Sequence, residues 1–287
     1  MFSEKRPIMS NDSIARIGVF DSGVGGLSVL RAIWQTIPEL PVIYLADQAH
    51  VPYGPRPLEE VRLFAEAISR YLISQGCKII VVACNAASAA ALHHLRAQFP
   101  ATPIVGMEPA VKPAAEHTLS GVVGVLATPA TFQGELYASV VERFASNVRL
   151  IPHTCPGLVQ QIEAGELDSP ETYRILSEAL EPMLLAKIDT IVLGCTHYPF
   201  VIPAIQKIAG ADVRVIDPAP AVAKQTRRQL LARGLLTGDI SSQQFPNPAN
   251  RTQFITTGEA ERFRSALRQL LDVDAVPIQL RWNQNSL

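Results

Sequence analysis

The sequence lacks an uninterrupted apolar run of the roughly 18 to 20 residues that a membrane-spanning helix needs. Its longest candidate, residues 79–92, is interrupted by Asn85 and Ser88. Residues 1–16 mix charged and polar side chains and lack the apolar centre of a secretory signal. We therefore expect a cytoplasmic protein that does not associate with a membrane.

An excess of charge of either sign is also missing. The 25 basic and 26 acidic side chains give a formal charge of -1. No global field therefore directs the protein to nucleic acid, and small partners are favoured. The glycine-rich run at 22–26 matches neither GxGxxG nor GxxxxGK[ST], which argues against a phosphate loop. Flexible backbone close to a small ligand is the better interpretation.

Cysteine is scarce, and its spacing excludes two kinds of site. The four cysteines show neither CxxC nor paired metal-ligand spacing, so we expect no zinc or other metal. In so long a chain expected in the cytoplasm, they indicate free thiols rather than a disulfide framework. They are Cys77, Cys84, Cys155 and Cys195.

Apolar strand-like runs alternate with helical patterns along the chain. In the segment 57–75, Pro57 suits a first helical turn, Glu59 suits the helix dipole and Gly76 can end the helix. The strand-like runs are almost continuously apolar, which is typical of parallel strands covered on both faces. They lie at 17–20, 42–45, 79–83, 103–105, 122–126, 148–151, 189–193 and 213–216. The pattern predicts a doubly wound α/β fold, with the Ser-, Gln-, Asn- and Pro-rich tract at 236–252 as an exposed loop.

One pattern occurs twice in the sequence. Residues 79–85 and 191–197 are each a buried-strand pattern that ends in a thiol, at Cys84 and Cys195. The segment upstream repeats at nearly the same separation, as IGVFDS at 17–22 and VGVLAT at 123–128. We interpret this as a diverged internal duplication, which predicts two pseudo-symmetric α/β halves with one sulfur on each side of a shared cleft. Such a geometry suits the movement of a proton across a carbon.

Both repeated cysteines precede a helical pattern, at 86–98 and at 199–208. A helix N-terminus lowers the pKa of a thiol from about 8.5 toward neutrality, so we expect thiolates that can act as bases. The alternative is that each cysteine only fills space in the core. A core does not require a duplicated pair of strand-end thiols, which favours a functional pair. Cys77 and Cys155 lack such partners and are interpreted as structural.

Two more side chains at strand ends are candidates for chemistry. His197 could hydrogen-bond a thiol or a substrate carboxylate, and the alternative is a surface histidine. Asp21 ends an apolar strand, where an unpaired carboxylate is costly. Its partner could be a ligand ammonium group or Cys84, and the alternative is an N-cap of the helical segment 22–37. Ligands of open parallel sheets bind beyond the carboxyl ends of the strands, so these loops should converge on one site.

The motifs taken together resemble those of glutamate racemases, within the aspartate/glutamate racemase family. The resemblance runs from about residue 16 to the C-terminal region, and its first and fourth motifs are specific in combination. The motifs are IGVFDSGVGGL (17–27), PYG (52–54), ACN (83–85), GCTHYP (194–199) and TTG (256–258).

The resemblance implies a cofactor-independent enzyme that interconverts L-glutamate and D-glutamate, a precursor of bacterial peptidoglycan. It implies two domains that enclose the amino acid, and the expected division is 16–108 with 220–287, and 109–219. Residues 1–15 form an N-terminal extension. Some relatives with such extensions respond to a cell-wall precursor, so this effector and a homodimer both stay open.

Site residues are also implied by the resemblance. Cys84 and Cys195 would be the two acid/base residues, assisted by Asp21 near the first and by Glu163 and His197 near the second. Glu163 rests on a segment, 155–163, that matches the family only in part. The implied substrate contacts are Asp21, Ser22, Tyr53, Gly54, Asn85, Ala86 through its backbone, Thr128, Thr131, Thr196 and His197.

One position departs from the family. Members usually have threonine where this sequence has Ala86, so one hydroxyl is missing near the substrate, and Ser88 or a water could compensate. Three other functions stay open. A thiol hydrolase would use Cys195 with His197 but leaves Cys84 unexplained. A non-enzymatic amino-acid sensor would not need both thiols, and a racemase of aspartate would use the same chemistry.

Overall fold

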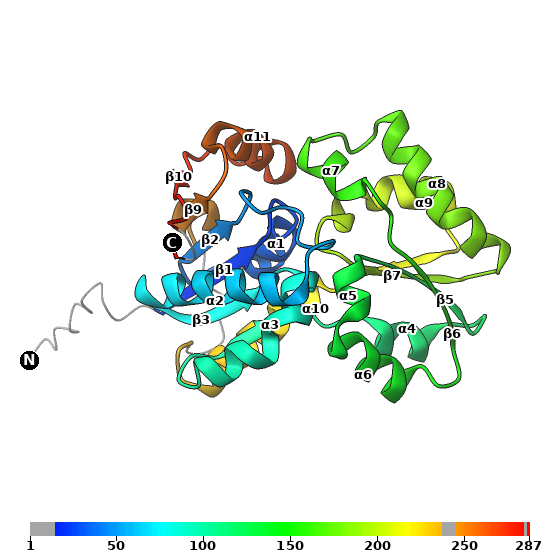
Figure 1. Cartoon of the computed structure of the whole chain (residues 1–287), viewed down its shortest axis with the longest axis horizontal. Helices are drawn as coiled ribbons and strands as arrows, with labels where there is room; N and C mark the ends of the chain where they lie inside the picture. Colours follow the sequence, from blue (N-terminus) through cyan, green and yellow to red (C-terminus); the bar gives the residue numbers. More distant parts are fainter. Residues whose placement is uncertain (1–14, 237–244, 284–285) are drawn as a thin grey trace, which may run out of the picture.

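The computed structural model describes residues 15–236, 245–283 and 286–287, and within them ten strands form two parallel sheets (Figure 1). Every strand pair in both sheets is parallel. The first sheet has the order β10 (Ile278–Gln279), β9 (Thr252–Thr256), β2 (Val42–Ala46), β1 (Arg16–Asp21), β3 (Cys77–Val82) and β4 (Ile104–Gly106). The second has the order β6 (Arg149–His153), β5 (Val122–Ala127), β7 (Thr190–Gly194) and β8 (Arg214–Ile216).

The two sheets share one strand order, which the internal duplication predicts. The order β2-β1-β3-β4 in the first sheet corresponds to β6-β5-β7-β8 in the second. The repeated segments therefore form the central strands β1 and β5, and the repeated cysteines follow the equivalent strands β3 and β7. The predicted fold class, two pseudo-symmetric α/β units with largely parallel sheets, is confirmed.

Helices cover both faces of the first sheet because its strands are apolar on both sides. Side chains of β2 alternate between two cores, with Val42 and Tyr44 in one and Ile43 and Leu45 in the other. The first core also receives α1 (Leu27–Thr36), α10 (Ala219–Ala232) and α11 (Ala260–Leu271). The second receives α2 (Leu58–Ser74) and α3 (Asn85–Gln98). Helix α10 packs on α1, so the chain returns to the first sheet after β8.

The second sheet is covered in the same way. One face packs against α7 (Leu158–Glu163), α8 (Pro170–Leu185) and α9 (Ile202–Ala209). The other packs against α4 (Val111–His117) and α6 (Glu135–Phe144), and α5 (Pro129–Gln133) contacts α3 of the first half. Helices α7 and α11 also meet across the two halves (Figure 1), where the Gln269 side chain donates to the Gly165 carbonyl at 2.7 Å.

The tract at 236–252 differs in part from the predicted exposed loop. Residues 237–244 lie outside the described residues, Pro248–Arg251 form a 3-10 helix and Thr252 begins β9. Strand β9 escapes prediction because only Phe254, Ile255 and Thr256 of its five residues are buried, too short an apolar run to stand out. Among the helices of the described segments, none is long and apolar enough to cross a membrane.

Candidate active site

The carboxyl ends of β1, β3, β5 and β7 meet at one pocket between the two halves, as the parallel topology requires. Of the predicted site residues, Asp21, Glu163 and Thr131 do not line this pocket, and Glu163 lines a neighbouring cleft. The predicted site residues that line the pocket between the halves are Ser22, Tyr53, Gly54, Cys84, Asn85, Ala86, Thr128, Cys195, Thr196 and His197.

The pocket is small. It offers about 20 Å³ to the centres of water molecules, which is room for roughly one or two waters. An amino acid with a carboxylate side chain is much larger than this space, so the pocket is closed to such a ligand in this structure.

Cys84 lies at the end of β3 and begins α3, where its sulfur accepts a 3.5 Å hydrogen bond from the Ala87 N–H. The thiol also contacts the Ser22 hydroxyl at 4.0 Å. Burial raises the pKa of Cys84 well above its ordinary value, and the nearby charge of Asp21 raises it further. The helix N-terminus acts in the predicted direction, but these two effects outweigh it. The prediction that this thiol has a lowered pKa is therefore wrong.

Asp21 is fully buried and is a neighbour of Cys84. Its Oδ2 accepts a 2.6 Å hydrogen bond from the Gly26 N–H in the loop before α1. The N-cap residue of α1 is Gly26, and no side chain caps this helix, so the N-cap alternative for Asp21 is wrong. Asp21 Oδ1 has no hydrogen-bond partner among the described residues. Burial raises the pKa of this carboxyl, although the charge of His197 opposes the rise. Asp21 can therefore hold a proton more readily than an exposed aspartate.

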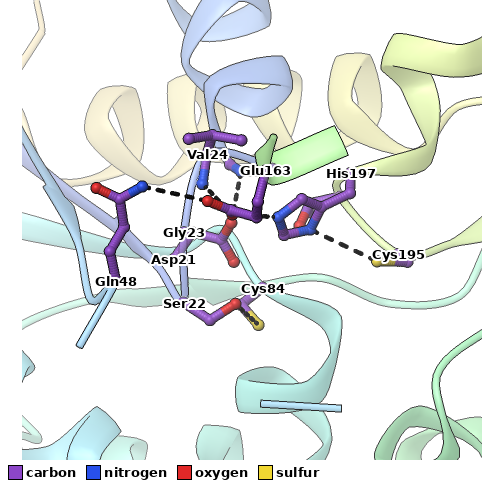
Figure 2. A network of polar contacts seen from close by, with 12 residues as sticks. Asp21, Ser22, Gly23, Val24, Gln48, Cys84, Glu163, Cys195 and His197 are labelled. Atoms are coloured by element: carbon purple, nitrogen blue, oxygen red, sulfur yellow. Dashed lines mark hydrogen bonds and ion pairs between the residues drawn. The ribbon is translucent and has the colours of Figure 1, made fainter. Parts of the chain in front are cut away.

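On the opposite side of the pocket, Cys195, His197 and Glu163 form a relay (Figure 2). His197 Nδ1 lies 3.8 Å from Cys195 Sγ, and His197 Nε2 lies 2.6 Å from Glu163 Oε1. Glu163 Oε1 also accepts from the Val24 N–H at 2.8 Å, and Oε2 accepts from Gln48 at 3.2 Å. The predicted helix after Cys195 begins as a 3-10 turn at Tyr198 and becomes α9 only at Ile202, so the relay rather than an α-helix faces this sulfur.

The relay carries a separated pair of charges. Burial by itself lowers the pKa of His197, but hydrogen bonds and charges from Cys195 and Glu163 hold it well above the ordinary value of 6.5. Burial by itself raises the pKa of Glu163, but hydrogen bonds and the charge of His197 hold it below the ordinary value of 4.5. His197 is therefore an imidazolium at neutral pH, and its Nδ1–H can donate to a thiolate.

A family model for Asp/Glu/Hydantoin racemases matches residues 17–226. The chain belongs to this family. It is 50% identical over 262 residues to the glutamate racemase of Roseiflexus sp. (strain RS-1), covering 91% of this chain and 94% of that relative. The predictions of the family and of a racemase, rather than a thiol hydrolase or a sensor, are thereby confirmed.

Solved structures of glutamate racemases share the arrangement of this racemase. That of Bacillus anthracis aligns with a TM-score of 0.80 at 30% identity, covering 96% of this chain and all (100%) of that one. That of Escherichia coli, in complex with L-glutamate and the activator UDP-MurNAc-ala, aligns with a TM-score of 0.76 at 30% identity. The alignment covers 89% of this chain and 95% of that one.

Some polar groups around the pocket of this racemase already form hydrogen bonds within the protein, and others do not. Both amide atoms of Asn85 are buried and have no hydrogen-bond partner among the described residues, so they are available to a ligand. The Tyr53 hydroxyl instead donates to Asp47 at 2.5 Å, which leaves its ring as pocket wall. The Thr128 and Thr131 hydroxyls lie 3.1 Å apart and bond to each other. Of these side chains, only that of Asn85 is left without a hydrogen-bond partner in the described part of the chain.

Ala86, where the family resemblance leads us to expect a threonine, is buried and lines the pocket. The suggestion that Ser88 replaces the missing threonine hydroxyl fails. Ser88 Oγ donates to the Val82 carbonyl at 3.3 Å and accepts from the Met107 N–H at 2.9 Å, so the fold uses it on both sides.

The two remaining cysteines lie outside the lining of this pocket and are buried. Burial raises the pKa of Cys77 and of Cys155 to about 12. Both are therefore thiols at neutral pH.

Three residues that contact the relay were not predicted to do so from the sequence. They are Val24 and Gln48, which bond to Glu163, and Gly25, which packs against His197. The glycine-rich run was the available signal, and its interpretation as backbone close to a ligand misses its second task. A Cβ at Gly25 would overlap the His197 ring, and one at Gly23 would overlap the Glu163 carboxylate. The small residues of the run therefore let the loop after β1 lie directly against the relay.

Gly25→Ala should therefore displace the His197 ring from Cys195. We expect kcat to fall roughly ten- to a hundredfold, because misplacement of a catalytic group by about 1 Å has effects of this size. Steady-state kinetics beside a thermal melt checks it. An unchanged kcat would show that the ring position is not critical for the reaction.

Proposed function

We propose that this racemase interconverts L-glutamate and D-glutamate with two cysteines, one on each face of the α-carbon. The observation that carries the proposal is that Cys84 and Cys195 line one small pocket from equivalent strand ends of two matching halves. The names of the relatives support glutamate as the substrate. A pair of opposed acid/base groups is what inversion of a proton-bearing carbon requires.

Each half-reaction transfers one proton. The thiolate of one cysteine takes the α-proton, so that the C–H bond breaks, an S–H bond forms and the electron pair stays on the α-carbon and the adjoining carboxylate. The thiol of the other cysteine then gives its proton to the opposite face and becomes a thiolate. The two sulfurs have exchanged protonation states, and exchange of their protons with water restores the starting state before the next turnover in the same direction. The reaction needs no redox partner.

The surroundings of the two sulfurs suit this division. Cys84, with a raised pKa, begins as the thiol, and Cys195 faces the His197 imidazolium, which can donate to a thiolate. Charge that develops on the substrate carboxylate needs oriented donors in a dry site. The Asn85 amide and the Ser22 and Thr196 hydroxyls on the pocket wall are suited to this.

We infer that the two units which open and close around the substrate are residues 16–108 with 220–287, and residues 109–219. The return of α10 and β9 to the first half supports this division. Direct contacts across it close the pocket. They include Val24 N–H to Glu163 at 2.8 Å, Ala130 N–H to the Gly54 carbonyl at 3.0 Å and Ser28 Oγ to the Thr196 carbonyl at 3.0 Å.

We further propose that the enzyme works in the cytoplasm and supplies D-glutamate for peptidoglycan, and that an anionic cell-wall precursor regulates it. The Escherichia coli relative was crystallised with such an activator. A second pocket, of about 400 Å³, presents the basic side chains Arg96, Lys112, Arg143 and Arg228 and could hold its phosphates. Titration of the activity with the precursor tests this role, and an unchanged rate would remove it.

The purified enzyme should convert either enantiomer of glutamate to the racemate without added cofactor or metal. It should convert aspartate about 10- to 200-fold more slowly in kcat/KM. A pocket built for one chain length discriminates a missing methylene by about 10- to 200-fold. Circular dichroism of the amino acid, followed under reducing conditions, measures both rates. If only aspartate loses its optical activity, the assignment of glutamate as the substrate is overturned. If neither amino acid loses it, the racemase function itself is overturned.

A further inference from the structure

A chain of hydrogen bonds continues the relay beyond Glu163 into the first sheet (Figure 2 shows its Gln48–Glu163 part). The Gly258 N–H donates to Thr256 Oγ1 at 3.0 Å, and the Thr256 hydroxyl donates to Gln48 Oε1 at 2.8 Å. Gln48 Nε2 then donates to Glu163 Oε2 at 3.2 Å. The chain thus runs from the end of β9, past the end of β2, to the last residue of α7.

Thr256 fixes the direction of the Gln48 amide. Because the threonine oxygen accepts from the Gly258 N–H, its own proton is left for Gln48 Oε1. An amide whose oxygen is held in this way must present its NH2 group to Glu163. The reversed amide would place oxygen against a carboxylate and leave the Thr256 hydroxyl without an acceptor. Gln48 is therefore oriented before Glu163 reaches it.

The two oxygens of Glu163 have different tasks. Oε1 holds His197 Nε2 and the Val24 N–H, whereas Oε2 has Gln48 as its hydrogen-bond partner among the described residues. The terminal torsion of a glutamate has a broad energy profile, so a carboxylate anchored at one oxygen only can rotate. Rotation would lengthen the contact with His197 and leave the imidazolium less firmly directed at Cys195.

We propose that Gln48, held by Thr256, is a positioning residue that fixes Glu163 against His197 and thereby serves the proton transfers of Cys195 but not those of Cys84. This inference rests on the proposed two-cysteine function and adds a residue to it. Gln48 belongs to the half of the molecule that carries Cys84, so the relay reaches its working geometry only when the two halves meet.

Gln48→Met tests the proposal, because methionine has a similar length and no hydrogen-bonding amide. Gln160→Met is the matched control. Gln160 is an exposed glutamine of α7 that lines the same cleft as Gln48 and Glu163, and its side chain makes no hydrogen bond among the described residues. We expect kcat/KM to fall about tenfold in Gln48→Met, the effect of one hydrogen bond to a charged group, and to stay unchanged in the control.

The two enantiomers of a substrate have equal free energy, so kcat/KM must fall equally in both directions and cannot by itself locate the damage. The primary isotope effect measured with α-deuterated glutamate can show which of the two proton transfers is slowed. In the direction in which Cys195 removes the α-hydrogen, a slower Cys195 step should raise this isotope effect. In the other direction, where Cys195 returns the proton, the isotope effect should fall and the solvent isotope effect should rise.

Opposite changes of the isotope effect for the two enantiomers would support the proposal, and equal changes or none would overturn it. If Gln48→Met is unstable, Thr256→Val should give the same opposite changes and Thr256→Ser, which keeps the hydroxyl, should not. If the wild-type enzyme racemises glutamate but the isotope effects of Gln48→Met and Thr256→Val change equally for the two enantiomers, the proposed function stays intact. Only Gln48 is then removed from the mechanism. A wild-type enzyme without activity would instead remove the function itself.

Discussion

Cys84→Ala and Cys195→Ala should each lower the rate of glutamate racemisation on the order of ten thousandfold, the upper range for loss of a general acid or base. Each variant lacks the group that serves one face of the α-carbon, and the remaining sulfur cannot reach that face. Both should still bind glutamate, because Asn85 and the loop hydroxyls remain. Steady-state rates and a binding titration measure the two effects separately.

Cys77→Ala is the matched control for the cysteine pair. It removes an equally buried thiol that does not line the pocket. Its kcat should stay near the wild-type value, although the cavity lowers the free energy of unfolding by about 1 kcal/mol. Near-normal turnover in Cys84→Ala or Cys195→Ala would exclude that cysteine from proton transfer.

His197→Asn should lower kcat on the order of a thousandfold and also lower the free energy of unfolding by about 3 kcal/mol. The ion pair with Glu163 is largely buried, with side chains 3% and 14% exposed, so removal of one partner leaves a buried charge. The double variant His197→Asn/Glu163→Gln should recover much of the stability and none of the activity. This separation checks that the pair serves the reaction and not only the fold.

The pH dependence of this stability has a definite sign. The pKa of His197 is raised, so its contribution is fully present below its ordinary value of 6.5 and is lost as the pH rises through the folded value. The pKa of Glu163 is lowered, so its contribution is present above its ordinary value of 4.5 and is lost as the pH falls through the folded value. The stability difference between wild type and the double variant should therefore be largest between pH 4.5 and 6.5. Denaturant melts at several pH values measure it, and a difference independent of pH would contradict the ion pair.

Strands and cysteines could be predicted because their signals are local. The central strands β1 and β5 are continuous apolar runs, and the duplication by itself pairs Cys84 with Cys195. Contacts between halves leave no such signal. Gln48 and Glu163, which lie in different halves, are 115 residues apart in the sequence. Gln48 and Thr256, which lie in the same half, are 208 residues apart, so only the folded chain brings either pair together.

The sequence also misleads about the pKa of Cys84. A helix N-terminus is visible in the sequence, and its effect on a thiol is known in direction. The burial of Cys84 and its closeness to Asp21 are properties of the fold. Both raise the pKa of Cys84, so the protonated thiol is favoured. A local motif therefore predicts which atoms meet more reliably than it predicts which of them carries the proton.

The isotope content of the first product tests the central claim of two opposed bases most directly. L-glutamate is converted in deuterated water to a few per cent, and the enantiomers are separated and weighed by mass spectrometry. Two bases predict that nearly all D-glutamate carries deuterium at the α-carbon, while the recovered L-glutamate keeps its hydrogen. D-glutamate that retains the original hydrogen would show that one group serves both faces and would contradict the account.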